Sequence, residues 1–180
     1  MNTTLWTEFV NSDRHDHLGT GRREDSLDDP AWLDRFLKRW GLEPPRVSRE
    51  RLVGALRKLR RFLQHEAENI ASGRPIKPEN LHGLNTYLDS SPLVRRLDLG
   101  QSRAEVRLEP VRRTVSSILG EIAFSFADTI ANGDASRIKV CGNKDCRWIL
   151  YDNSKSKTRK WCESTCGNLM KVRRFRQKRR

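Results

Sequence analysis

Residues 141–166 read CGNKDCRWILYDNSKSKTRKWCESTC and contain every cysteine of the chain. Cys141 and Cys146 form one close pair, and Cys162 and Cys166 form a second pair after fifteen intervening residues. Two close pairs joined by a loop can deliver four thiolates to one tetrahedral metal ion. The spacing therefore predicts a metal site with these four cysteines as its ligands.

A structural zinc ion is the occupant that the cysteine pattern favours. Clustered cysteines bind metal in reducing compartments, where thiols do not pair covalently. A segment of about forty residues buries too little surface to fold alone, and the binding energy of zinc becomes folding energy. Two disulfides, an iron–sulfur cluster and unliganded thiols are the alternatives. A catalytic zinc is disfavoured because four thiolates leave no open position for water.

The chain around the cysteines carries the signals of a small finger. Residues 141–146 are expected to form a knuckle, residues 148–151 a strand and residues 152–154 a turn. Cys162 and Cys166 are four residues apart, so they share one face if they begin a helix. The N-terminus of such a helix favours the thiolate form that the metal requires.

Positive charge is concentrated in the last quarter of the chain. The whole chain carries a net charge of +13, and residues 137–180 contain 15 Lys and Arg against 3 Asp and Glu. Such asymmetry predicts a polyanionic partner for this segment. The candidate nucleic-acid contacts are the basic residues between the cysteine pairs and after the second pair: Lys155, Lys157, Arg159, Lys160, Lys171, Arg173, Arg174, Arg176 and Lys178.

A helix that continues past Cys166 would present part of this charge as an ordered array. The residues expected to pack inward are Leu169, Met170 and Val172. The residues expected to project toward a DNA major groove are Arg173, Arg174 and Arg176. Cationic side chains bind phosphate oxygens, and arginine can also bind guanine edges through two hydrogen bonds. The basic loop before Cys162 would hold the nucleic-acid backbone.

The first 135 residues have the periodic apolar pattern of a mainly helical domain. Four helices are expected: from the Asp29-Pro30 start to Trp40, from the Ser48 cap to Ile70, from Asn80 to Ser90, and from Pro110 to Ile130. A β-hairpin is expected from two short runs, 93–98 and 104–109. Residues 11–28 are polar and are expected to form a loop, and residues 5–10 fit a short helix or a short strand.

The predicted fold is mainly α with a small β-hairpin, in the α+β class. A helical domain at 1–135 precedes a small zinc-finger domain at 136–180, with a treble-clef-like arrangement as the expected form of the finger. No apolar segment is long enough to span a bilayer and no secretory signal begins the chain, so a cytoplasmic location is expected.

The sequence around the cysteines resembles the CGNR zinc-finger family. In that family a D-x-S element precedes R-x-W-C, and C-G-N-R follows. Residues 152–154 match the first element, residues 159–162 the second and residues 166–168 the start of the third. Leu169 stands where the family's arginine would stand, and this departure leaves the four ligands intact.

The N-terminal part is similar to the ABATE-type domains that accompany this finger. The similar segments are 9–12, 25–27, 31–41 and 84–85, together with the expected hairpin. The resemblance implies a bacterial-type, stress-induced transcriptional regulator with a helical domain and a DNA-binding finger.

The sequence thus favours a DNA-binding transcriptional regulator that uses structural Zn²⁺. Double-stranded DNA at the nucleoid is the expected partner, and a homodimer and a small-molecule effector on the N-terminal domain are further expectations. An RNA-binding or ribosome-associated protein and a protein-interaction scaffold are the alternatives. No phosphate-binding glycine loop, nucleophile elbow or metalloprotease helix occurs, so we expect no enzymatic activity.

Overall fold

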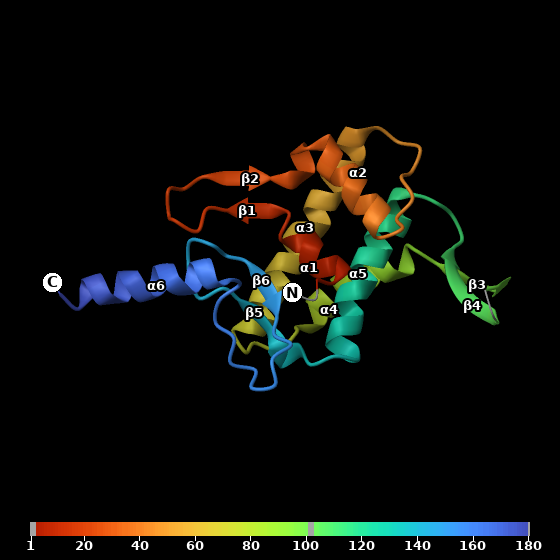
Figure 1. Cartoon of the computed structure of the whole chain (residues 1–180). Coiled ribbons are helices and arrows are strands. Elements are labelled where there is room, and N and C mark those ends of the chain that lie inside the picture. Colours follow the sequence, from red (N-terminus) through yellow and green to blue (C-terminus); the bar gives the residue numbers. More distant parts are fainter. Residues whose placement is uncertain (1–2, 101–102, 180) are drawn as a thin grey trace.

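The computed structural model describes residues 3–100 and 103–179. Its helices are α1 (Leu5–Val10), α2 (Pro30–Arg39), α3 (Arg49–Ala71), α4 (Pro78–Asp89), α5 (Val115–Ala131) and α6 (Ser164–Gln177). Its strands form antiparallel two-stranded ribbons: β1 (Asp13–His15) with β2 (Arg23–Asp25), β3 (Leu93–Leu99) with β4 (Ala104–Pro110), and β5 (Ile138–Val140) with β6 (Ile149–Tyr151). The predicted α+β fold, mainly helical, is confirmed. Figure 1 shows the helical body with α6 and the β3–β4 ribbon extending from opposite sides.

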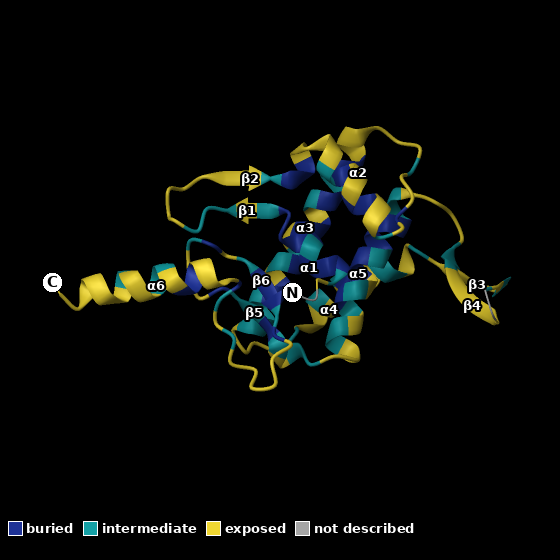
Figure 2. Cartoon of the chain, viewed as in Figure 1, coloured by how far each residue is buried: buried dark blue, intermediate teal, exposed yellow. Residues whose placement is uncertain are grey.

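The core of the body forms around α3, because its apolar residues recur at helical spacing. Leu56, Leu59 and Leu63 are fully buried, and α1 and α5 pack against them with Phe9 and Phe126. Figure 2 shows this dark blue centre where α1, α3 and α5 meet. Removing such side chains from water stabilises the fold by about 2 kcal/mol each. Within the described residues, no helix combines the length and apolarity needed to cross a membrane.

The helix starts predicted at Asp29-Pro30 and at Ser48 are confirmed by the caps of α2 and α3. The Asp29 carboxylate accepts a hydrogen bond from the backbone N–H of Ala31 at 2.9 Å, and Pro30 is the first helical residue. The Ser48 hydroxyl accepts from the backbone N–H of Arg51. Each cap satisfies one backbone donor that has no partner inside the helix.

The predicted start of α5 at Pro110 is wrong. Pro110 ends β4, where its backbone pairs in register with Leu93, and Val111 is exposed rather than buried. Thr114 forms the cap instead, exchanging hydrogen bonds with Ser117. A proline is tolerated at the end of a two-stranded ribbon, because no further strand needs its missing N–H.

The predicted loop at 11–28 is wrong in part, since residues 13–15 and 23–25 form the β1–β2 ribbon, while residues 16–22 connect the two strands without regular structure. Asp13 and Arg23 join the two strands through an ion pair at 2.6 Å. The Asp16 carboxylate closes the tip by accepting from the backbone N–H groups of Leu18 and Thr20, each at 3.0 Å. Charge pairing holds this ribbon, so its sequence lacks the apolar alternation by which strands are recognised.

The finger is anchored to the body by the β5–β6 ribbon, which lies against α3 and α1. Ile149 points into the core of the body, while the next residue, Leu150, packs among the four cysteines. Successive side chains of a strand point to opposite faces, so β6 joins the two cores. The finger consists of the knuckle at 141–146, the β5–β6 ribbon and the ligand-bearing helix α6, and its treble-clef-like form stays a prediction.

Candidate metal centre and basic surface

The four cysteines converge on one point. All four sulfurs lie within 4.8 Å of one another, and all four residues are buried. The Sγ atoms of Cys146 and Cys162 are 3.6 Å apart, as are those of Cys162 and Cys166. Tetrahedral zinc with Zn–S bonds of about 2.3 Å requires S–S separations of about 3.8 Å. The cysteines are not joined by disulfides, and their arrangement fits a closed structural zinc site.

The four thiols also need a cation if they are to ionise together. A hydrogen bond from the Cys162 thiol lowers the pKa of Cys146 to about 5. The hydrogen bond to Cys146, together with burial, raises the pKa of Cys162 far above its ordinary value, and burial raises that of Cys166 to about 11. Adjacent negative charges repel, and a bound metal ion would offset this repulsion and keep all four cysteines as thiolates.

The first cysteine pair lies in the connection between β5 and β6. The backbone N–H of Cys141 donates to the Trp148 carbonyl at 2.8 Å, and that of Cys146 donates to the Asn143 carbonyl at 3.0 Å. Asn143 is fully buried, and its Nδ2 lies 3.8 Å from the Cys166 sulfur. These bonds fold residues 141–146 into the predicted knuckle.

The second pair is placed by the start of α6, although only one of its members belongs to the helix. Glu163 is the residue before the first turn and has an extended backbone, so Cys162 precedes the helix and Cys166 lies in its first turn. The two cysteines would have shared a helical face if both began the helix, and the structure does not meet this condition. The two sulfurs still lie 3.6 Å apart, with the extended Glu163 between Cys162 and the helix.

Trp161 explains why a glycine follows Cys141 and another follows Cys166. Its ring packs against Gly142 and Gly167, where an added Cβ would lie 2.8 Å and 3.0 Å from the ring atoms. A side chain at either glycine would displace the ring. Trp161 and Trp148 are half-buried against the cysteines, which fits the packing role predicted for them rather than an exposed stacking platform.

Asp152 organises the basic loop, a role that its expected place in a turn did not reveal. Its carboxylate is fully buried and accepts from Lys139 Nζ at 3.0 Å and from the backbone N–H groups of Ser154 at 3.0 Å and Arg159 at 2.9 Å. Burial alone would raise the pKa of Asp152, but these hydrogen bonds outweigh it and hold the pKa well below the ordinary value. Asp152 therefore stays ionised and fixes both ends of the loop.

Three of the predicted nucleic-acid contacts are engaged within the protein. The Arg159 guanidinium donates to the Trp161 carbonyl at 3.0 Å and to the carbonyl of Cys162. Lys157 pairs with Asp134 at 2.6 Å. These two side chains hold the loop in place, so phosphate binding would have to compete with their internal partners.

Arg173 is the third, and it does not project freely as predicted. Its guanidinium pairs with Asp145 at 2.7 Å and donates to the Leu18 carbonyl at 2.8 Å. The carbonyl of His17 accepts from Asn143 Nδ2 at 2.7 Å. The tip of the β1–β2 ribbon thus contacts both the knuckle and α6. Proximity in space, not in sequence, gives Arg173 its partners.

The other predicted contacts are exposed basic residues. Those on or just after α6 form what we call the α6 surface: Lys171, Arg174, Arg176 and Lys178. Figure 2 shows α6 exposed along most of its length, pointing away from the body. Val172 is 46% exposed, so the expectation that it packs inward is wrong. Within the described residues, six predicted contacts are exposed and make no ion pair: Lys155, Lys160, Lys171, Arg174, Arg176 and Lys178.

A further contact between the body and the finger is made by Asn11, a residue to which sequence reasoning gave no structural role. Asn11 is buried, and its side chain pairs with the backbone of Ile149: Nδ2 donates to the carbonyl at 2.7 Å, and Oδ1 accepts from the N–H at 2.9 Å. The side-chain amide thus pairs with the backbone of β6 in the way that a neighbouring strand would. A polar residue in a polar segment gave no signal of this role.

Comparison with known families agrees with this architecture. Residues 3–133 match the ABATE model, described as "Putative stress-induced transcription regulator", and residues 137–179 match the CGNR zinc finger. None of the curated proteins searched matches the chain. The first model covers well over half of the chain, and the second covers the four-cysteine centre, which identifies its metal as structural zinc. The chain therefore belongs to the ABATE family and carries a CGNR zinc finger.

Proposed function

We propose that this protein is a transcriptional regulator that binds double-stranded DNA through the α6 surface. The observation that carries the proposal is the placement of α6: one of its first-turn residues, Cys166, is a zinc ligand, and the rest of the helix extends into solvent. The zinc site fixes where the helix begins and therefore where its cations point. The family description of a transcription regulator supports a DNA partner.

The dimensions and charge of α6 suit a major groove. A helix of 14 residues is about 21 Å long, and B-DNA has a major groove about 12 Å wide that admits one helix. Arg174 and Arg176 have no acidic partner within the described residues, so they are available for phosphates or guanine edges. Lys155 and Lys160 lie on the adjoining loop, from which they would contact the DNA backbone.

The same proposal gives the zinc a structural role and the protein no catalytic one. Four cysteine ligands close the coordination sphere, so no position remains for an activated water. The protein would act in the cytoplasm, on DNA of the nucleoid.

Salt dependence of DNA binding tests this proposal. Neutralising about four phosphates gives a slope of log K against log salt of about −3.6. Lys171→Gln, Arg174→Gln and Arg176→Gln combined should weaken binding to duplex DNA and reduce the slope by up to about 2.7. Fluorescence anisotropy with labelled duplexes over a salt series measures both quantities.

A matched control removes three exposed cations from the body. Arg46→Gln, Arg95→Gln and Arg112→Gln combined lower the net charge equally, at residues that make no ion pair within the described chain. This control should bind DNA like the parent protein. Equal losses in both triple variants would refute a specific role for the α6 surface, and stronger competition by RNA than by duplex DNA would favour the RNA-binding alternative.

A further inference from the structure

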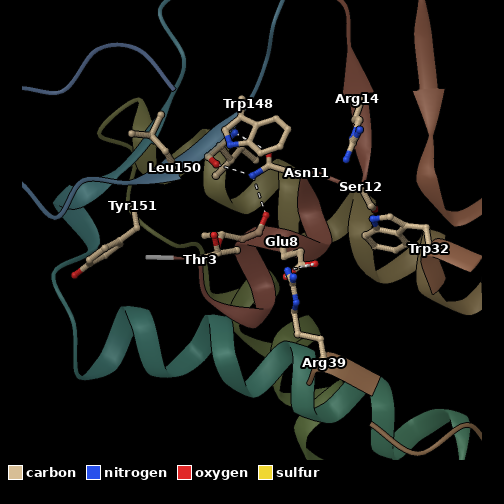
Figure 3. A pocket seen from close by; sticks show the side chains of 12 residues that line it. Thr3, Glu8, Asn11, Ser12, Arg14, Trp32, Arg39, Trp148, Leu150 and Tyr151 are labelled. Atoms are coloured by element: carbon tan, nitrogen blue, oxygen red, sulfur yellow. Dashed lines mark hydrogen bonds and ion pairs between the residues drawn. The ribbon is translucent and has the colours of Figure 1, made fainter. Parts of the chain in front are cut away.

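A cavity of about 220 Å³ lies where the body meets the finger. Its walls come from α1, β1 and α2 of the body and from the chain at β6 of the finger, as Figure 3 shows. Glu8, Asn11, Arg14, Trp32, Trp148 and Ile149 are among the residues that line it. This volume is below the usual range for drug-sized ligands, about 300–1,000 Å³, so the cavity suits a small molecule.

Internal contacts hold the walls of the cavity in place before any ligand arrives. The Trp32 ring stacks on Phe36, with ring centroids 5.0 Å apart. The Glu8 carboxylate accepts from Arg39 at 3.2 Å and from the Trp40 indole N–H at 3.0 Å. The floor is fixed by the paired hydrogen bonds between Asn11 and β6 described above. A preorganised cavity loses little entropy when it binds a ligand.

The polar groups left over in the cavity are hydrogen-bond donors. The Arg14 guanidinium makes no hydrogen bond or ion pair within the described residues, and neither the Trp32 nor the Trp148 indole N–H finds an acceptor there. Thr7 and Ser12 already bond to neighbouring backbone carbonyls. Arg14 is exposed and the two indoles are half-buried, so these donors bond to solvent until a ligand brings acceptors. A carboxylate brings the strongest acceptors for a guanidinium.

The charge and shape of the walls complete the description of the ligand. The lining holds two arginines, Arg14 and Arg39, and one acid, Glu8, which leaves a net charge of +1. Two indole rings offer flat apolar surfaces, on which an aromatic ring can lie. We propose that this cavity binds a small aromatic carboxylate, with its acid group on Arg14 and its ring against Trp32 and Trp148.

Such a ligand would bridge the two parts of the protein. Ile149 and Leu150 both line the cavity, and they belong to the core of the body and to the zinc core respectively. A bound acid would therefore stabilise the docking of β6 on the body. If the proposed function holds, this is the effector site through which a small molecule changes DNA binding, because binding at one site can alter another only by favouring one arrangement.

Ligand binding can be tested without DNA, on the full zinc-loaded chain. The probes are benzoate, salicylate and indole-3-acetate, with benzamide as a neutral counterpart of benzoate, measured by calorimetry and by the indole N–H signals in ¹⁵N spectra. We expect at least one acid to bind and to shift the Trp32 and Trp148 signals. Benzamide should bind about tenfold more weakly than benzoate, because it lacks the charge that pairs with arginine.

Arg14→Gln should weaken binding of the acid about tenfold. Arg22→Gln is the matched control, since Arg22 is an exposed cation on the same ribbon that does not line the cavity, and it should bind like the parent. The proposal is overturned if none of the three acids binds, if acid and amide bind equally, or if Arg14→Gln keeps the parent affinity. Because no DNA is present, these outcomes are separate from failure of the proposed function, which the salt series tests.

Discussion

Helices α5 and α6 have similar lengths, 17 and 14 residues, but different means of support. α5 buries Ile118, Ile122 and Phe126 in the body. The buried residues of α6 are Cys166 and Gly167, next to the metal site, and the rest of the helix is half-buried or exposed. An isolated helix of this length is marginal in water. Apolar packing therefore stabilises α5, whereas α6 depends on the zinc that holds its first turn.

Loss of a zinc ligand should produce the largest difference between the two helices, because α6 should unfold while α5 stays folded. Structural zinc sites bind with apparent free energies of about 10–16 kcal/mol, so Cys162→Ser should unfold the knuckle and α6 while the body stays folded. Hydrogen exchange measured helix by helix should show lost protection in α6 and unchanged protection in α5. Duplex DNA binding should be lost with it.

Ser164→Ala serves as the control for this variant, because Ser164 is exposed at the start of α6. It should keep both helices and bind zinc in a one-to-one ratio. Parent-like protection of α6 in Cys162→Ser, or elemental analysis without zinc in the purified parent, would show that the helix does not depend on the metal.

Asn11→Ala should weaken the contact between the body and β6 of the finger without changing the metal site. The change leaves the backbone N–H and carbonyl of Ile149 without their partners, and each buried unsatisfied group costs about 1–3 kcal/mol. We expect a loss of about 3 kcal/mol in the free energy of unfolding, with zinc stoichiometry unchanged. Denaturant unfolding and elemental analysis give the two results, and unchanged stability would mean that β6 docks through apolar packing alone.

Acid should weaken the body through a buried ion pair. Arg60 is 3% exposed and forms a two-pronged pair with Asp25, at 2.6 and 2.7 Å. Burial alone would raise the pKa of Asp25, but hydrogen bonds from Arg60, Leu27 and Arg57 lower it to about 2. The folded pKa is thus below the unfolded value of about 3.9. This contribution is complete above about pH 4 and is lost as the pH falls toward 2.

The expected loss is up to about 2 kcal/mol. It is measured by denaturant unfolding between pH 5 and pH 2.5 in the Cys162→Ser background, where zinc release cannot contribute. The Asp25→Asn variant in the same background should be less stable at neutral pH and should lack this part of the acid dependence. A pH dependence identical in both proteins would assign the acid sensitivity to other carboxylates.

The contrast between α5 and α6 also shows which features could be predicted from the sequence. Regular apolar spacing predicted the buried faces of α3 and α5, and the spacing of the cysteines predicted the metal ligands, because both patterns are local. The β1–β2 ribbon was missed because its strands are joined by charge pairs such as Asp13–Arg23. Asn11 was missed because its partner, Ile149, lies 138 residues away in the chain.

The basic residues show the same limit within the finger. Sequence reasoning predicted that Arg159, Arg173 and Arg174 all contact nucleic acid, since all three lie close to ligands in a basic segment. The fold gives Arg159 two carbonyl acceptors and gives Arg173 an acid and a carbonyl. Whether a cation is free depends on which acceptors the chain brings near it, and this is decided by tertiary structure.

Arg173 and Arg174 provide the smallest and most discriminating test. They are neighbours on α6, but the first faces Asp145 and Leu18 while the second is exposed. Arg173→Gln should lower the free energy of unfolding by at most about 1 kcal/mol, as for other partly exposed pairs. It should also increase hydrogen exchange at the tip of the β1–β2 ribbon, because the tip loses its bond to α6.

Arg174→Gln should do the opposite: it should weaken DNA binding and reduce the salt slope by about 0.9, with exchange at the ribbon tip unchanged. The two variants carry the same charge, so net electrostatics cannot explain a difference between them. If both lower DNA affinity equally and neither changes exchange at the tip, then Arg173 leaves Asp145 to bind DNA. The β1–β2 ribbon would in that case not orient α6, and only the zinc site would set the direction of the helix.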